Sequence, residues 1–215
     1  MGYYSNYLYP RIVDKILSTS RVSQYRKEIL SHVIGEILEI GFGTGLNLSY
    51  YPAWVKEITV IDNNEGMNSL AQKRVKHSKI NVNLKLLNAE ILPFEDKSFD
   101  SIVSTFTFCS IENIDSALKE IYRVLKPDGK LIFLEHGLSS NKKLRNLQHR
   151  LNPLYKVVSG GCNLNRDMKD VIERNNFKFD FIEEFTSKDM SKLTGYLYKG
   201  IAIKRGTFEK FKLLL

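Results

Sequence analysis

Three glycines stand at every second position directly after a short apolar run. Gly41, Gly43 and Gly45 follow residues 37–40, which read Ile, Leu, Glu and Ile. Glycine lets the backbone turn sharply and approach a ligand closely, although the same residues also suit a plain strand-to-helix turn. The dinucleotide pattern G-x-G-x-x-G needs its third glycine at position 46, where Leu46 stands, and no G-x-x-x-x-G-K-[ST] phosphate loop is present. The spacing therefore disfavours both NAD and a nucleoside triphosphate.

Two further polar segments follow apolar stretches downstream of the glycines. Asp62 ends the run Val60-Ile61-Asp62, and a carboxylate at the tip of a second strand can accept hydrogen bonds from both ribose hydroxyls. The alternative is that Asp62 caps the helix that follows. The segment Asn88-Ala89-Glu90 could present an amide and a backbone N–H to an adenine edge, but alone it would be an ordinary loop. Together with the glycines, these segments favour a nucleoside-containing ligand.

His136 is the candidate general base, since it follows a predicted strand and imidazole titrates near neutral pH. The alternative is a histidine with a purely structural hydrogen bond. Adjacent side chains alternate along a strand, so only one of Glu135 and His136 needs to face a cleft. Cys109 and Cys162 are too few for a disulfide scaffold, fit a reducing cytosol, and are expected to be small buried side chains. Their spacing and the absence of a His/Cys cluster in the sequence argue against a zinc site, so no metal is expected.

The elements that position these residues alternate along the chain. Strands are predicted at 37–40, 57–62, 82–87, 101–106, 130–135, 177–181 and 196–204, and helices near 10–17, 22–30, 64–77, 114–125, 142–151 and 166–175. An apolar stripe of Ile12, Val13, Ile16 and Leu17 marks the first helix. Strands separated by helices predict one α/β domain with a doubly wound, mostly parallel sheet and helices on both faces.

Charge is uneven along the 215 residues. The chain has 32 basic and 24 acidic side chains, and residues 138–215 alone hold 16 and 8. The excess is either a solvated lysine-rich surface or a region that favours an anionic acceptor or an acidic membrane surface. No segment reaches the roughly 18 apolar residues of a membrane span, and the tyrosine-rich start does not resemble a signal peptide. We therefore expect a cytoplasmic protein, with peripheral membrane contact as an open alternative.

The ordered motifs resemble those of class I S-adenosylmethionine (SAM)-dependent methyltransferases. They are E-I-G-F-G-T-G, the strand-end Asp62, N-A-E-x-L-P-F, S-F-D-S-I-V and L-K-E-I-Y-R-V-L-K-P-D-G, which together span residues 35–137. The resemblance implies a seven-stranded sheet whose last strand is antiparallel, with SAM as cofactor and S-adenosylhomocysteine as product. The family often has Asp where this chain has Asn88. The implied cofactor residues are Glu39, Gly41, Phe42, Gly43, Gly45, Asp62, Asn63, Met67, Asn88, Ala89, Glu90, Thr105 and Phe106.

Within these residues the resemblance implies separate roles. Glu39 would position the methionine amine, and Asp62 would hold the ribose. Asn63 and Met67 would flank the adenine, whose edge Asn88 and Ala89 would read. Thr105 and Phe106 would border the methionine and the sulfonium.

The flanking motifs resemble a small-molecule branch of that family. N-L-S-Y-Y-P, L-E-H at 134–136 and S-G-G-C-N-L-N-R-D at 159–167 are similar to animal alkyl-thiol methyltransferases and bacterial phosphatidylethanolamine N-methyltransferases. The N-terminal membrane anchor of the animal enzymes is not expected here. The resemblance implies in-line methyl transfer to a small or lipid-like thiol, amine or hydroxyl. Residues 1–34 are predicted to form a helical lid, 35–137 the cofactor core and 138–215 the substrate side, where Tyr4, Tyr7, His149 and Cys162 would contact the acceptor.

Two other functions remain open from the sequence. One is a module that binds SAM without turnover. The other is an RNA methyltransferase that uses the basic C-terminal region, but the Asn/Asp-Pro-Pro-aromatic signature is missing, because residues 104–107 read Ser-Thr-Phe-Thr. A nucleic-acid partner is therefore not expected.

Overall fold

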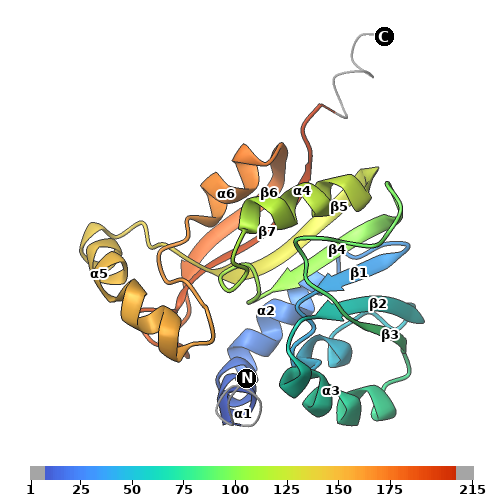
Figure 1. The fold of residues 1–215 in the computed structure, drawn as a ribbon, viewed down its shortest axis with the longest axis horizontal. Coiled ribbons are helices and arrows are strands. Elements are labelled where there is room, and N and C mark those ends of the chain that lie inside the picture. Colours follow the sequence, from blue (N-terminus) through green and yellow to red (C-terminus); the bar gives the residue numbers. More distant parts are fainter. Residues whose placement is uncertain (1–7, 207–215) are drawn as a thin grey trace.

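A computed structural model describes residues 8–206, which fold around a single seven-stranded sheet. The strand order is β3-β2-β1-β4-β5-β7-β6, and β7 is antiparallel to both of its neighbours while the other strands run in one direction (Figure 1). The strands are β1 (Ile37–Ile40), β2 (Glu57–Asp62), β3 (Asn81–Leu86), β4 (Phe99–Thr105), β5 (Leu125–His136), β6 (Phe177–Thr186) and β7 (Tyr196–Lys204). The predicted doubly wound sheet with an antiparallel last strand is confirmed.

Helices cover both faces of the sheet (Figure 1). They are α1 (Tyr9–Leu17), α2 (Ser20–Leu30), α3 (Glu65–His77), α4 (Ile114–Val124), α5 (Lys142–Val158) and α6 (Met168–Arg174), with a short 3-10 helix at Leu46–Ser49. The buried side chains form two clusters, one with α4 and α6 and the other with α2 and α3. Leu131 and Phe133 join the first cluster, whereas Ile132 and Leu134 join the second, as the two-residue period of a strand requires.

The register of the central strands places the polar segments together at the carboxyl ends of these strands. Ile40 pairs with Ile61 and with Ser104, and Asp62 pairs with Leu86. The loops that follow β1, β2, β3 and β4 therefore begin side by side at the carboxyl ends of the strands. Open α/β sheets bind their ligands at these ends.

Some boundaries differ from the sequence predictions, and the apolar stripe of the first helix is only partly covered. Ile12 and Ile16 are 41% and 47% exposed. Tyr9, Val13 and Leu17 of the same helix line a cavity. The strand predicted from residue 130 begins at Leu125, and α5 continues through Pro153 to Val158. Within residues 8–206 we find no helix with the length and apolar character needed to cross a membrane.

Candidate active site

A cavity of about 460 Å³ lies at the carboxyl ends of the central strands. That volume falls within the roughly 300–1,000 Å³ of small-molecule sites. Of the thirteen residues predicted to hold the cofactor, Gly45 alone is absent from its walls. The predicted residues that line it are Glu39, Gly41, Phe42, Gly43, Asp62, Asn63, Met67, Asn88, Ala89, Glu90, Thr105 and Phe106. The fold therefore brings the separate sequence motifs into one site.

The first two glycines of the loop have different surroundings. Gly41 has φ of +71°, and a Cβ there would lie 2.1 Å from the Thr107 Oγ1 atom. Gly43 has φ of +58°, but a Cβ there would meet nothing closer than the Gly41 carbonyl oxygen, 3.9 Å away. Gly41 is therefore required for packing of the loop against Thr107, whereas Gly43 leaves open space on the cavity side.

Asp62 is tied to the loop from the end of the neighbouring strand. Its Oδ2 accepts the Gly43 N–H at 2.7 Å, and its Oδ1 accepts the Asn64 N–H at 2.8 Å. Burial raises the pKa of Asp62, against the lowering effect of these backbone donors. Each carboxylate oxygen can accept a second hydrogen bond, so ribose hydroxyls can still bind. The cap of α3 is Asn64, whose Oδ1 accepts from Gly66 and Met67, and the helix-cap alternative for Asp62 is wrong.

Glu39 and Arg26 form a buried polar network at the other end of the cavity. Glu39 accepts from Asn47 Nδ2 at 2.9 Å and from the Tyr51 hydroxyl at 2.6 Å. Burial raises the pKa of Glu39 to about 7, although these donors act in the opposite direction. Arg26, 3% exposed, donates to Asn47 Oδ1 at 2.6 Å and to Thr105 Oγ1 at 2.7 Å. The network places one carboxylate and one guanidinium on the same cavity.

Sequence reasoning missed Arg26. Its side chain lines the cavity, its guanidinium lies 5.2 Å from the Phe106 ring centroid, and its Nε has no hydrogen-bond partner within the described chain. A signal was available, because position 26 lies four residues after the buried Val22 and three before the buried Ile29. An arginine on the inward face of an amphipathic helix is costly unless it binds something.

The part of the cavity wall around Met67 and Ala89 is less polar. Ala89 and Met67 are buried, whereas Asn88 is exposed and accepts the Glu90 N–H through Oδ1 at 3.0 Å. Leu87 and Ile111 also line this part. An apolar slot with an exposed amide at its rim suits a flat heteroaromatic ring.

Helix α1 lies over the cavity and is fastened to it. Tyr9, Val13 and Leu17, four residues apart, line the wall. On the same helix, Asp14 accepts from Thr44 Oγ1 at 2.5 Å and from Arg74 of α3 at 2.8 and 3.1 Å. Asp14 therefore joins α1 to the glycine loop and to α3 beside the cavity. Tyr4 and Tyr7 lie outside the described residues.

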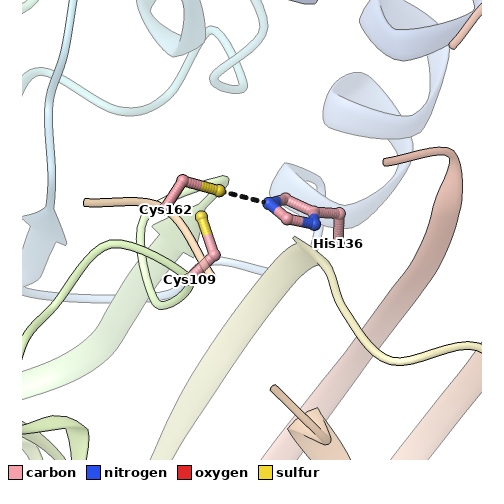
Figure 2. Close-up of side chains that lie close together, drawn as sticks. All are labelled: Cys109, His136 and Cys162. Atoms are coloured by element: carbon pink, nitrogen blue, oxygen red, sulfur yellow. Dashed lines mark hydrogen bonds between the residues drawn. The ribbon is translucent and has the colours of Figure 1, made fainter. Parts of the chain in front are cut away.

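His136 and Cys162 are in contact with each other but do not line the cavity. The His136 Nε2 atom lies 2.9 Å from Cys162 Sγ, and Cys109 packs beside them (Figure 2). The potential ligand atoms of these three buried residues all lie within 4.8 Å of one another. The sequence argument that the chain has no His/Cys cluster is therefore wrong, because three separate segments supply the members.

The neighbours of these residues have different positions. Glu135 is buried, and it accepts from Ser104 Oγ at 2.7 Å and from the Thr107 N–H at 3.0 Å. Gly160 and Gly161, next to Cys162, do line the cavity. His149 is exposed on α5, where its Nδ1 contacts Asn165 Nδ2 at 3.2 Å, and it is not part of the cavity wall.

Comparison with known protein families matches residues 38–133 to the methyltransferase domain model. The thiol S-methyltransferase TMT1B of Rattus norvegicus is 32% identical over 145 residues, which is 66% of this chain and 59% of that protein. Human thiol S-methyltransferase TMT1A is 30% identical with the same coverage. The ubiquinone/menaquinone biosynthesis C-methyltransferase UbiE of Bartonella henselae is 38% identical over 46% of this chain and 40% of its own length. The chain thus spans about 59% of the length of these two thiol methyltransferases.

Solved structures share the fold at low identity. The YcgJ protein of Bacillus subtilis superimposes with a TM-score of 0.65 at 17% identity, covering 85% of this chain and 98% of that one. A putative methyltransferase of Haloferax volcanii, solved with the Trm112 activator, gives 0.69 at 15% identity, covering 92% and 98%. The [4+2]-cyclase SpnF gives 0.64 at 18% identity, covering 92% and 81%, so the fold alone does not fix the reaction.

The topology and the strand-end cavity are those of the Rossmann-like methyltransferase fold. Residues 38–133 form a methyltransferase domain of the class I SAM-dependent type.

Proposed function

We propose that the chain binds SAM in the strand-end cavity and transfers its methyl group to a small or lipid-like acceptor, with a thiol as the first candidate. The observation that carries this proposal is the single cavity that holds twelve of the thirteen predicted cofactor residues. The thiol preference rests on the relatives that are named thiol S-methyltransferases. Amines and hydroxyls remain the other acceptor classes.

The residues fit the parts of SAM. Asp62 would accept from the ribose hydroxyls, and the slot near Met67 and Ala89 would take the adenine. Glu39 would attract the ammonium of the methionine end. Arg26, with its unpaired Nε on the same wall, would pair with the carboxylate of that end.

The chemistry requires mainly alignment. SAM supplies a methyl group on a sulfonium, which is already a good leaving group. A thiolate attacking in line would form a new S–CH₃ bond while the bond between that methyl carbon and the SAM sulfur breaks, leaving S-adenosylhomocysteine. Orientation of the reactants can lower a barrier by about 7–11 kcal/mol, whereas a general base adds roughly 10²–10⁴-fold. We assign no proton transfer to His136, which does not line the cavity.

The walls beyond the cofactor residues suit an anionic, partly apolar acceptor. Val13 and Leu17 supply apolar surface, and Thr107 and Ser110 supply hydroxyls. Lys156 is the one lysine on the described wall. A nearby cation favours the thiolate over the thiol, and the thiolate is the reactive form.

Exposed apolar side chains on α1 and α5 support access from an acidic membrane surface. Leu8, Ile12 and Ile16 are 41–48% exposed on or next to α1, and Leu154, Val157 and Val158 are 51–79% exposed on α5. Tyr9 of α1 and Gly160, just after the end of α5, both line the cavity, and a Cβ at Gly160 would lie 3.0 Å from the Tyr9 ring. We expect the chain to float with anionic vesicles and not with neutral ones. Equal recovery with both would count against this route.

The experiment that tests the proposed function offers methyl-labelled SAM to the purified chain with a panel of acceptors. The panel contains small thiols, amines, phenols, phospholipids and RNA. We expect transfer to thiols and none to RNA. Tight SAM binding without transfer to any acceptor would favour the non-catalytic module, and transfer to RNA alone would favour the nucleic-acid alternative.

A further inference from the structure

Cys109, His136 and Cys162 form a buried cluster of soft ligands behind the cavity wall. Their residues are 3%, 4% and 7% exposed, and all three potential ligand atoms lie within 4.8 Å of one another. Figure 2 shows the two sulfur atoms next to each other, with Cys162 Sγ facing the imidazole Nε2. Both cysteines are free thiols, and these are the only two cysteines of the chain.

The contacts of the cluster are largely internal. The imidazole Nε2 contacts Cys162 Sγ, whereas Nδ1 is buried and has no hydrogen-bond partner among the described residues. The Cys109 sulfur has only long contacts elsewhere, 3.7 Å to Ser110 Oγ and 3.9 Å to the Phe106 carbonyl oxygen. The Cys109 sulfur therefore has no close hydrogen-bond partner outside the cluster among the described residues.

The donor set and its size match a known class of ligand. Two thiolates and an imidazole are ligands of Zn²⁺, which takes sulfur at about 2.3 Å and nitrogen at about 2.0–2.1 Å. A tetrahedral ion with those bond lengths has S···S and S···N edges of about 3.8 and 3.6 Å. Both edges lie inside the 4.8 Å limit, and the 2.9 Å contact of Nε2 with Sγ needs to lengthen by less than 1 Å.

We propose that Cys109, Cys162 and His136 bind one divalent ion of the zinc class. Binding replaces the two thiol protons, which are released to solvent, and leaves His136 neutral, so the bound site has no net charge. Three protein ligands leave one tetrahedral position for water or another donor. Because the ligands are buried, the ion enters as the chain folds.

The ion would cross-link three segments that lie at or next to the part of the cavity where we place the acceptor. Cys109 lies in the loop after β4 beside Ser110, Cys162 lies in the turn that contains Gly161, and His136 ends β5. Ser110 and Gly161 line the cavity. The first two segments are already joined by Asn163, whose Nδ2 donates to the Cys109 carbonyl oxygen at 2.8 Å. The metal would therefore stabilise the acceptor wall without contacting SAM.

A disulfide between Cys109 and Cys162 is the competing outcome. It would need an oxidant and would leave the adjacent imidazole without a ligand role. The imidazole within hydrogen-bond distance of a thiol favours the metal, because it supplies the third ligand.

The test measures metal content of the full chain expressed with added Zn²⁺ or Co²⁺. We expect native mass spectrometry to show one ion per chain with the loss of two protons, and the Co²⁺ form to show thiolate-to-cobalt charge-transfer absorption. The double variant Cys109→Ser/Cys162→Ser and the variant His136→Ala should lose the ion and the absorption. The control His149→Gln changes an exposed histidine outside the cluster and should keep both.

A thermal melt and SAM binding show whether each variant is folded. Cys162→Ala provides a second, more conservative removal of one ligand if the double variant does not fold. The proposal is overturned if folded wild-type chain, expressed with added metal and kept reduced, carries no more ion than the cysteine variants, or if the purified chain has an intact disulfide and no metal. Metal content does not depend on methyl transfer, so failure of one proposal leaves the other standing.

Discussion

Asp62 Oδ2 accepts a hydrogen bond from the Gly43 N–H at 2.7 Å, which joins the end of β2 to the glycine loop after β1. The same carboxylate therefore positions the loop and faces the cavity where we place the ribose. Because Asp62 is buried and its pKa is raised, the cofactor hydroxyls would supply donors that stabilise the ionised form. Loop geometry and ligand binding are thus coupled through one side chain.

SAM affinity is expected to rise with pH in the range where Glu39 ionises. The pKa of Glu39 is about 7 in the folded chain, above its ordinary value of 4.5, because the carboxyl is buried. The carboxylate attracts the ammonium of SAM, so affinity should increase by up to about tenfold per pH unit as pH approaches 7 from below. Calorimetry at several pH values measures this, and Glu39→Gln should flatten the profile. An unchanged slope in the variant would contradict the role of Glu39.

The raised pKa of Glu39 should also make the stability of the ligand-free chain depend on pH. A raised folded-state pKa contributes stability that is fully present below about pH 4.5 and is lost as pH rises through about 7. Urea unfolding of the ligand-free chain should show this decline, and Glu39→Gln should reduce it.

Arg26→Met should weaken SAM binding roughly 10–100-fold, because a hydrogen bond to a charged group is worth about 1.5–3 kcal/mol. It should also lower stability, since Asn47 and Thr105 lose their buried donor. Arg21→Met is the matched control on the same helix, because the Arg21 side chain is 50% exposed and pairs with Asp189. A Kd for Arg26→Met equal to that of the control would remove Arg26 from the proposed site.

Asp14→Asn should speed SAM release several-fold while the melting temperature changes little. The ion pair of Asp14 with Arg74 is partly exposed, and such pairs contribute about 0–1 kcal/mol. Its loss would loosen the attachment of α1 over the cavity rather than unfold the core. Stopped-flow measurement of SAM dissociation checks this, with Lys15→Gln, an exposed change on α1, as control. Identical release rates for the two variants would argue against α1 as a cover.

Alanine at Gly41 and at Gly43 should produce different defects. Both positions are left-handed, which costs an alanine about 1–2 kcal/mol. Gly41→Ala also places a Cβ 2.1 Å from Thr107, and overpacking costs about 1–3 kcal/mol more. Gly43→Ala meets no such contact and should mainly lose SAM affinity. Denaturant unfolding and SAM titration separate the two, and equal stability losses would contradict this difference.

The fold and the cofactor side of the site could be predicted because their signals are local. Ile37–Ile40 and Glu57–Asp62 are strands with the predicted bounds; Gly41 directly follows the first, and Asp62 ends the second. Parallel pairing then brings such strand ends together. A long segment whose apolar residues repeat with one helical or strand period can be identified without knowledge of its tertiary contacts.

The rest depends on contacts between distant segments. Arg26 meets Thr105 across 79 positions of sequence, and His136 meets Cys162 across 26. Neither pair has a spacing that marks a motif. The apolar stripe of α1 does not by itself show which of its members are covered: Val13 and Leu17 line the cavity, whereas Ile12 and Ile16 are exposed.

Calorimetric titration of SAM into the full chain and into Asp62→Ala tests the central claim most directly. We predict one SAM per wild-type chain and no measurable binding to Asp62→Ala, while Asp128→Ala, an exposed change remote from the cavity walls, binds as the wild type does. Folding of each variant is checked by its melting transition. Wild-type affinity in a folded Asp62→Ala chain would contradict the placement of SAM in this cavity.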